Sequence, residues 1–74
     1  MEDTIWKIWS EFTKAEDENS DLSFGELGGT SIKLLMMINK LNKTFQLRLT
    51  VLDVFDTKNY REFEEVIQKK LSAN

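Results

Sequence analysis

Hydrophobic residues recur at helical spacing near the start of the chain. The positions are Ile5, Ile8, Trp9 and Phe12, which follow one another at i, i+3, i+4 and i+7. This period predicts an amphipathic helix with one buried face. Asp3 or Thr4 can cap its start, because both residue types accept hydrogen bonds from first-turn amides, and the pattern continues to about Lys14.

A second helical pattern follows a loop rich in glycine and hydroxyl residues. The loop ends in Gly28-Gly29-Thr30-Ser31, and good helix formers then run from Ile32 to Lys43. Thr30 or Ser31 is predicted near the cap. The predicted core positions are Leu34, Met37, Ile38, Leu41 and Phe45. Ile32 and Met36 lie on the opposite side among lysines, which is compatible either with a partner surface or with isolated exposed side chains.

The C-terminal third predicts one short helix and one long helix. Thr50-Val51-Leu52-Asp53 has the layout of a capping box, with Asp in place of Glu or Gln, and a short helix through about Asp56 would bury Val54 and Phe55. Asn59-Tyr60-Arg61-Glu62 is a second capping signal. The last helix is expected from Tyr60 to about Leu71, with four inward positions: Phe63, Val66, Ile67 and Leu71.

The connections complete the expected fold. Ala15 to Ser23 is polar and acidic, which predicts a solvated loop, and Phe24 and Leu27 are expected to pin that loop to the core. Thr44 to Leu49 is expected to be extended. Residues 1–74 are therefore predicted to form a single all-α domain, a small four-helix bundle of three long helices and one short helix. The pattern leaves open whether this domain stands alone or belongs to a multidomain protein.

Composition and charge exclude several functions. The 74 residues contain neither Cys nor His, which excludes disulfides, zinc sites built from these ligands, and a Ser–His catalytic pair; we expect no metal site. A net charge of −3 with scattered Lys and Arg argues against nucleic acid as a partner. No apolar run approaches membrane length, and there is no signal-peptide layout, so a cytoplasmic protein is expected. The chain is also expected to be a monomer.

The serine at position 31 is the candidate functional residue. The chain supplies no effective general base that would make the Ser31 hydroxyl a nucleophile. It has no His, and Lys33 at i+2 does not face Ser31 along a helix. A carboxylate such as Glu26 or Asp21 activates serine poorly. No catalytic residue is expected. A phosphodiester on its oxygen would instead lie at a helix N-terminus, which stabilises anions. The alternative interpretation is that the tetrapeptide only turns the chain and caps the helix.

The wider motif resembles the thiolation domains (peptidyl carrier proteins) of nonribosomal peptide synthetases, within the acyl-carrier-protein-like family. Leu27-Gly28-Gly29-Thr30-Ser31 is similar to their Leu-Gly-Gly motif, which ends in the serine that receives 4′-phosphopantetheine. Phe24 and Glu26 match residues that usually precede this motif, and Val54-Phe55 resembles the Leu-Phe of the short third helix. The resemblance covers nearly the whole chain.

The resemblance implies how the chain functions. Ser31 would be the attachment point, bordered by Gly28, Gly29 and Thr30. A phosphopantetheinyl transferase would move the arm from coenzyme A with magnesium. The thiol of the arm would then carry aminoacyl, peptidyl or acyl groups as thioesters to adenylation, condensation, thioesterase or ketosynthase domains of nonribosomal peptide or hybrid polyketide assembly lines. The chain itself would be a non-catalytic carrier.

The same resemblance implies a partner surface along the central helix. Ile32 and Met36 would be apolar anchors, and three lysines surround them: Lys33, Lys40 and Lys43. The absence of acidic residues from Ile32 to Lys43 favours peptide or hybrid polyketide assembly over fatty-acid synthesis. Thr30 and Leu52 depart from the usual pattern and could shift partner preference. Two other hypotheses remain: a helical protein–protein adaptor with no prosthetic group, and a small hydrolase that uses Ser31.

Overall fold

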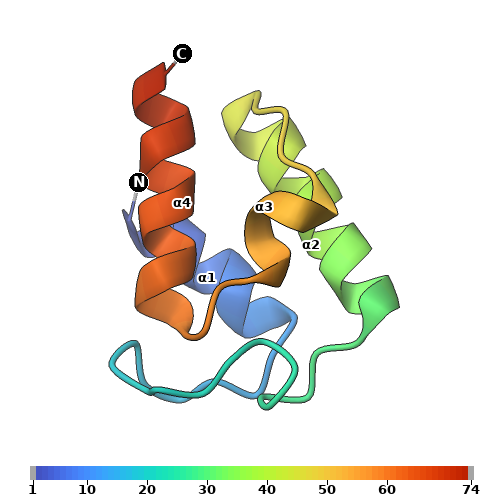
Figure 1. Ribbon diagram of the computed structural model, residues 1–74, viewed down its shortest axis with the longest axis vertical. Coiled ribbons are helices and arrows are strands. Elements are labelled where there is room, and N and C mark those ends of the chain that lie inside the picture. The colour runs from blue at the N-terminus through green and yellow to red at the C-terminus, as the bar shows by residue number, and fades with distance from the viewer. Residues whose placement is uncertain (1, 74) are drawn as a thin grey trace.

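The computed structural model describes the backbone of residues 2–73 and the side chains of residues 4–73. Within this range the chain forms four helices and no strand (Figure 1). They are α1 (Glu2–Glu11), α2 (Ser31–Phe45), α3 (Val51–Phe55) and α4 (Tyr60–Ala73). The predicted all-α bundle of three long helices and one short helix is confirmed.

The helices pack around one core. α1 contacts both α2 and α4, and the short α3 bridges α2 and α4 (Figure 1). The fully buried side chains come from the three long helices and include Trp9, Met37, Leu41, Phe63 and Ile67. Trp9 lies at the centre, with its ring centroid 4.6 Å from that of Phe63. Since the chain has no disulfide, burial of these side chains is the main source of its stability.

The helix bounds differ from the prediction at both ends of α1. The helix includes Glu2, so Asp3 and Thr4, which were predicted as its cap, lie within it. It ends at Glu11 rather than near Lys14. The cause is competition for hydrogen bonds, because the Thr13 hydroxyl donates to the Trp9 carbonyl (2.9 Å) and the Lys14 amide donates to the Leu27 carbonyl (2.8 Å). The predicted stripe of α1 is nevertheless buried as expected.

The segment after α2 is helical for longer than expected. Thr44 and Phe45, predicted to be extended, are still in α2, and Gln46 ends the helix in the left-handed conformation, with a φ of 56°. Asn42 then holds the outgoing chain. Its side-chain amide donates to the Leu49 carbonyl (3.1 Å) and its oxygen accepts from the Leu49 amide (2.8 Å). These two bonds set the direction in which α3 starts.

The last two helices largely follow the prediction, with one error of burial. The capping box over Thr50–Asp53 is present, and Asn59 caps α4 by accepting from the Glu62 amide (2.9 Å). Val54 is buried as expected, but the prediction that Phe55 is buried is wrong: Val51 and Val54 occupy the side of α3 that packs against the core, and the Phe55 side chain is left exposed. α4 extends to Ala73, two residues beyond the predicted end.

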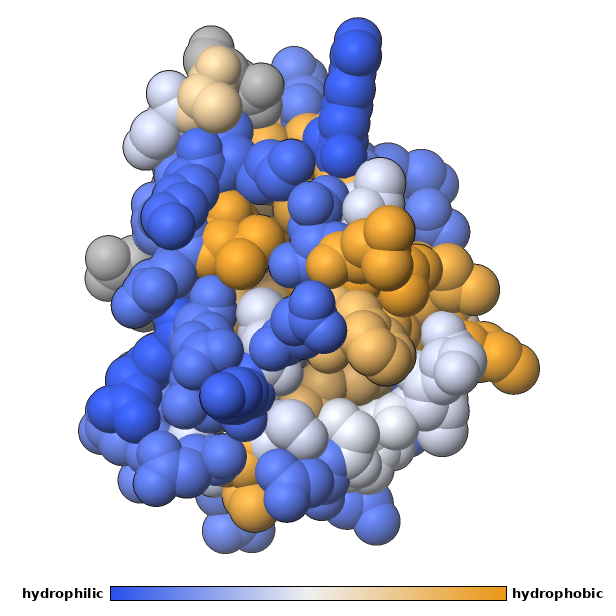
Figure 2. All heavy atoms as spheres, in the orientation of Figure 1, coloured by the Kyte–Doolittle hydropathy of each residue, from blue (hydrophilic) through white to orange (hydrophobic). Residues whose placement is uncertain are grey.

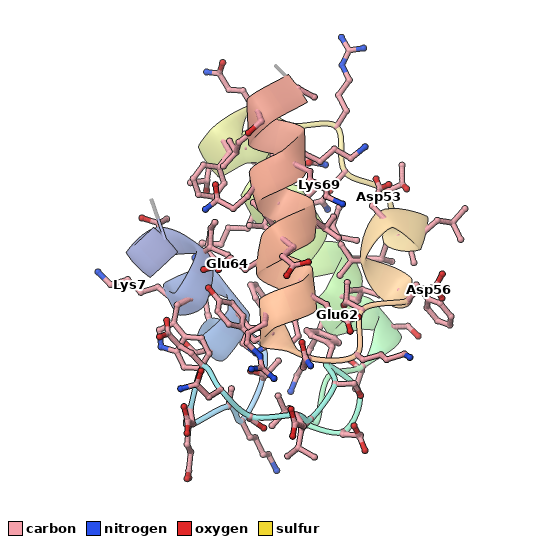
Figure 3. The ribbon with its side chains drawn as sticks, turned by 60° about the vertical axis from the view of Figure 1, so that its left-hand side comes forward. Lys7, Asp53, Asp56, Glu62, Glu64 and Lys69 are labelled. Carbon is pink, nitrogen blue, oxygen red and sulfur yellow. The ribbon has the colours of Figure 1, made fainter. Side chains whose placement is uncertain are left out.

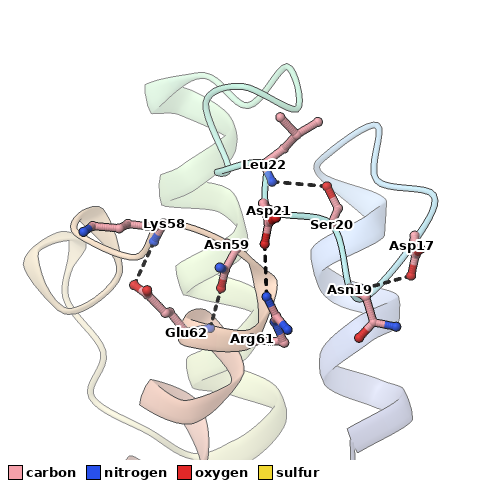
Figure 4. Close-up of polar contacts among 9 residues, drawn as sticks. All are labelled: Asp17, Asn19, Ser20, Asp21, Leu22, Lys58, Asn59, Arg61 and Glu62. Atoms are coloured by element: carbon pink, nitrogen blue, oxygen red, sulfur yellow. Dashed lines mark hydrogen bonds and ion pairs between the residues drawn. The ribbon is translucent and has the colours of Figure 1, made fainter.

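The long loop between α1 and α2 is ordered by polar contacts. Asp17 accepts from the Asn19 amide (2.9 Å) and Ser20 from the Leu22 amide (3.2 Å), so two side-chain turns shape the acidic stretch (Figure 4). Arg61 at the start of α4 donates to Asp21, 40 residues earlier (3.0 Å). Phe24 and Leu27 are buried, as predicted, and they bring the loop back over the core toward α2.

Candidate functional site

Ser31 is the first residue of α2 and its side chain is exposed. Thr30 is the cap, not Ser31. Its hydroxyl oxygen accepts from the Lys33 amide (3.2 Å) and its carbonyl accepts from the Leu34 amide (2.8 Å). Among the side-chain hydrogen bonds of residues 4–73, none involves the Ser31 hydroxyl. The sequence left the cap open between the two residues, and the structure assigns Thr30 to capping, so the Ser31 hydroxyl is unused.

Two backbone amides at the start of α2 also lack protein acceptors within the described residues. Thr30 satisfies the amides of Lys33 and Leu34, but within the described residues no acceptor meets those of Ser31 and Ile32. No acidic side chain occupies the first turn of α2. Free first-turn amides and the positive end of the helix dipole favour an anion at this position. The start of α2 is therefore electrostatically suited to a negatively charged group next to the Ser31 oxygen.

Positions 28 and 29 each require glycine, but for different structural reasons. Gly28 has a φ of 88°, which side chains rarely allow, and its amide donates to the Gly25 carbonyl (3.1 Å). Gly29 has no such φ, but a β-carbon there would lie 2.2 Å from Cε2 of Phe24. In the structure, Gly28 makes the turn and Gly29 makes room for the Phe24 ring.

A shallow cavity of about 290 Å³ lies beside Ser31. The loop, α2 and α3 all line it: Ser23, Phe24, Gly25, Gly29, Thr30, Ser31, Leu34, Val54, Phe55 and Thr57. None of these side chains is ionisable in the physiological range. The two carboxylates considered from the sequence are engaged elsewhere, because Asp21 binds Arg61 and Glu26 accepts from the Ser23 amide (2.9 Å). The cavity can therefore hold an apolar or neutral group, but it offers the Ser31 hydroxyl no general base.

Exposed hydrophobic side chains surround the site on α2 and α3. Figure 2 shows them gathered on the side of the molecule where these helices lie. Ile32 (71% exposed), Met36 (53%) and Leu52 (81%) were predicted partner residues, and all three side chains are exposed. The sequence analysis missed Leu35 (52%) and Phe55 (69%). Five large apolar side chains over two adjacent helices are more than isolated exposures.

The predicted lysines do not form one cluster. The side chains of Lys33 and Lys43 are exposed, whereas Lys40 pairs with Glu11 at the end of α1, so much of its charge is compensated. Met36, Lys40 and Lys43 line a second shallow groove, between α2 and Phe12 of α1. Lys40 and Lys43 therefore lie on the side of α2 toward α1, together with Met36.

The position of α3 is set by Asp53. Its Oδ2 accepts from the Thr50 amide (2.8 Å) and hydroxyl (3.2 Å), and its Oδ1 lies 3.6 Å from the Lys70 ammonium of α4. The hydrogen bond from the Thr50 backbone, with help from the Thr50 hydroxyl and Lys70, lowers the pKa of Asp53 below its ordinary value of 3.8 despite partial burial. Asp53 of α3 and Asp56, the residue that follows α3, border the same groove as Glu62 and Lys69 of α4, and all four are labelled in Figure 3. The described residues contain no cluster of acidic side chains able to hold a metal ion.

Comparison with known families extends these observations. A family model described as "Phosphopantetheine attachment site" matches residues 3–67 of the 74. No curated protein and no solved structure matches the chain significantly. None of the four helices is both long enough and apolar enough to cross a membrane, within the residues that the structure describes. The family match spans all the elements that form the site, from α1 to the buried part of α4.

Proposed function

Because the chain belongs to the phosphopantetheine attachment site family, we propose that Ser31 is the residue that carries 4′-phosphopantetheine. Members of this family bind the group covalently and hold thioester intermediates on it. One observation supports Ser31 above all: its hydroxyl is exposed and unbonded at the first residue of α2, since Thr30 has taken the capping role.

The residues present suit a phosphate-linked group. The Ser31 oxygen would hold it covalently, and the amides of Ser31 and Ile32 are available to the phosphodiester oxygens. In the attachment step the Ser31 oxygen bonds to phosphorus as the pyrophosphate bond of coenzyme A breaks and the adenine nucleotide leaves. The hydroxyl proton passes to a base of the transferase, because the cavity beside Ser31 contains no ionisable side chain.

When bound, the arm supplies a thiol that carries acyl groups as thioesters. Carrier domains are generally non-catalytic, and this chain's own residues present the arm rather than act on its cargo. Tethering raises the local concentration of the cargo at each partner enzyme, so the flexible link replaces free diffusion. Ser31 and the exposed Phe55 line the same cavity, so the attachment point of the arm would lie next to exposed apolar side chains.

We further propose that these apolar side chains are the docking surface. They are Ile32, Leu35, Met36, Leu52 and Phe55. The surface borders Ser31, so a partner that covers it would bring its active site to the arm. α2 carries Lys33, Lys40 and Lys43 and no acidic residue, which favours partners from cytoplasmic peptide or hybrid polyketide assembly lines over fatty-acid synthesis. The proposed partners are the transferase and adenylation, condensation, thioesterase or ketosynthase domains.

Intact mass spectrometry tests the attachment site. The purified chain is incubated with coenzyme A, magnesium and a broad-specificity phosphopantetheinyl transferase. We expect a gain of one phosphopantetheine unit, no gain for Ser31→Ala, and an unchanged gain for Ser23→Ala, which removes another hydroxyl from the same cavity. Modification of Ser31→Ala would reject Ser31 as the site. No gain in any variant would favour the adaptor alternative, a helical interaction module without a prosthetic group.

A further inference from the structure

Phe24 and Gly29 are packed against each other more closely than any other residue could allow. A β-carbon built on Gly29 would lie 2.2 Å from Cε2, 2.3 Å from Cδ2 and 2.7 Å from Cζ of the Phe24 ring. A β-carbon essentially never comes within 3.0 Å of a heavy atom outside its own residue and the two neighbouring residues. The Gly29 amide also donates to the Phe24 carbonyl (2.9 Å). The two residues are thus joined through both ring and backbone.

The same ring is anchored in the core. Phe24 is buried, and its centroid lies 5.6 Å from that of Trp9 in an edge-to-face arrangement. Trp9 itself is fully buried at the centre of the bundle. Phe24 also forms one wall of the cavity that Ser31 borders. A continuous set of contacts therefore leads from Trp9 through Phe24 to Gly29, two residues before Ser31.

We propose that the Phe24 ring, seated on Gly29, is the positioning element that sets where the Ser31 hydroxyl is presented. The inference rests on the proposed attachment at Ser31. Thr30 and Ser31 follow Gly29 directly, so a displacement of Gly29 moves the cap of α2 and the hydroxyl together. Phe24 does not touch the reacting atoms, and it acts only through the backbone that it holds.

The three glycines of the loop provide matched controls, because each responds to an added methyl group for a different reason. At Gly25 a β-carbon would meet nothing within 4 Å. At Gly28 it would make only ordinary contacts with Lys14, at 3.6 Å, but the φ of 88° strains the backbone. At Gly29 the three nearest atoms all belong to the Phe24 ring, and the backbone is not in the left-handed region. Replacing the Phe24 ring by the smaller leucine side chain should therefore restore the reaction rate of Gly29→Ala but not that of Gly28→Ala.

The test measures kcat and KM of a phosphopantetheinyl transferase for seven forms of the full chain: wild type, Gly25→Ala, Gly28→Ala, Gly29→Ala, Phe24→Leu, and the Gly28→Ala and Gly29→Ala variants each combined with Phe24→Leu. Phe24→Leu alone serves as the reference for the double variants. Measurements are made at a temperature where urea unfolding shows every form to be folded, so that stability does not enter. Amide signals of Thr30, Ser31 and Lys33 in nitrogen-15 spectra are recorded in parallel.

We expect Gly29→Ala to lower kcat roughly 10- to 100-fold, since a small misplacement of a reacting group has effects of this size. KM should change little, because the exposed residues of α2 and α3 are untouched. Gly25→Ala should match the wild type. Phe24→Leu should restore the rate and amide signals of Gly29→Ala to those of Phe24→Leu alone, and should leave Gly28→Ala slow.

The inference is overturned if Gly29→Ala reacts at the wild-type rate, or if Phe24→Leu rescues both alanine variants or neither. A wild type that is not modified at Ser31 would instead reject the proposed function. In that case the amide signals alone decide the inference: it stands if those of Gly29→Ala shift and return in the Phe24→Leu background, and fails if they do not.

Discussion

The ammonium of Lys70 lies 3.6 Å from the Asp53 carboxylate, and this pair joins α4 to α3. The same carboxylate accepts the Thr50 amide at the start of α3, so one side chain both caps the short helix and attaches it to a long one. A helix of five residues is not stable alone, and it depends on such contacts. Because α3 carries Leu52 and Phe55, Asp53 holds two of the five residues of the proposed docking surface in place.

We predict that this contribution of Asp53 depends on pH. The folded state lowers the pKa of Asp53 below 3.8, so its stabilisation is fully present above that value and is lost as pH falls through the folded pKa. At pH 7 we expect Asp53→Asn to lower the free energy of unfolding by roughly 0.5–1 kcal/mol in urea titrations. Below the folded pKa the difference should vanish. Asp56→Asn, an exposed position next to the same helix, is the control, and an equal loss for both variants would contradict the prediction.

Thr30 and Ser31 should show opposite phenotypes although they are adjacent. Thr30→Ala removes the cap of α2 and is expected to lower the free energy of unfolding by about 1 kcal/mol, while leaving Ser31 open to modification. Ser31→Ala removes an exposed, unbonded hydroxyl, so stability should stay within about 0.5 kcal/mol while modification is abolished. Urea unfolding and intact mass separate the two effects. A large loss of stability for Ser31→Ala would mean that its hydroxyl takes part in the cap.

Phe55 and Val54 are adjacent in α3 but differ completely in exposure. Phe55→Ala should change the free energy of unfolding by under about 0.5 kcal/mol, because the ring is 69% exposed. Val54→Ala should cost roughly 1.5–3 kcal/mol, since Val54 is buried. We expect Phe55→Ala to raise the KM of the transferase for the carrier several-fold. An unchanged KM would exclude Phe55 from the surface that the transferase binds.

The exposed lysines of α2 should contribute to docking through charge. Lys33→Glu and Lys43→Glu are expected to raise the KM of the transferase at low salt, and the effect should diminish at 1 M salt, where charges are screened within about 3 Å. Lys7→Glu is the control, because Lys7 is an exposed lysine on α1 (Figure 3). Equal effects at all three positions would show that only net charge matters and that α2 has no special role.

Several features were determined by the sequence alone, because they depend on local periodicity and capping. The spacing of Ile5, Ile8, Trp9 and Phe12 fits only a helical period, and all four side chains are buried. The capping signals at Thr50 and Asn59 start helices where they were predicted. Ser31 was identified as the candidate site from its place between a glycine-rich loop and a helix, which is also a local feature.

Other features were decided only by the tertiary structure, because they depend on contacts between residues far apart in the chain. α1 stops at Glu11 since the Lys14 amide finds the Leu27 carbonyl, and Gly29 is required since Phe24 folds back onto it. Phe55 is as hydrophobic as a core residue, yet Val51 and Val54 occupy the side of α3 that packs against the core, and Phe55 is left exposed. Hydrophobicity specifies which residues can be buried, but the geometry of packing decides which of them are.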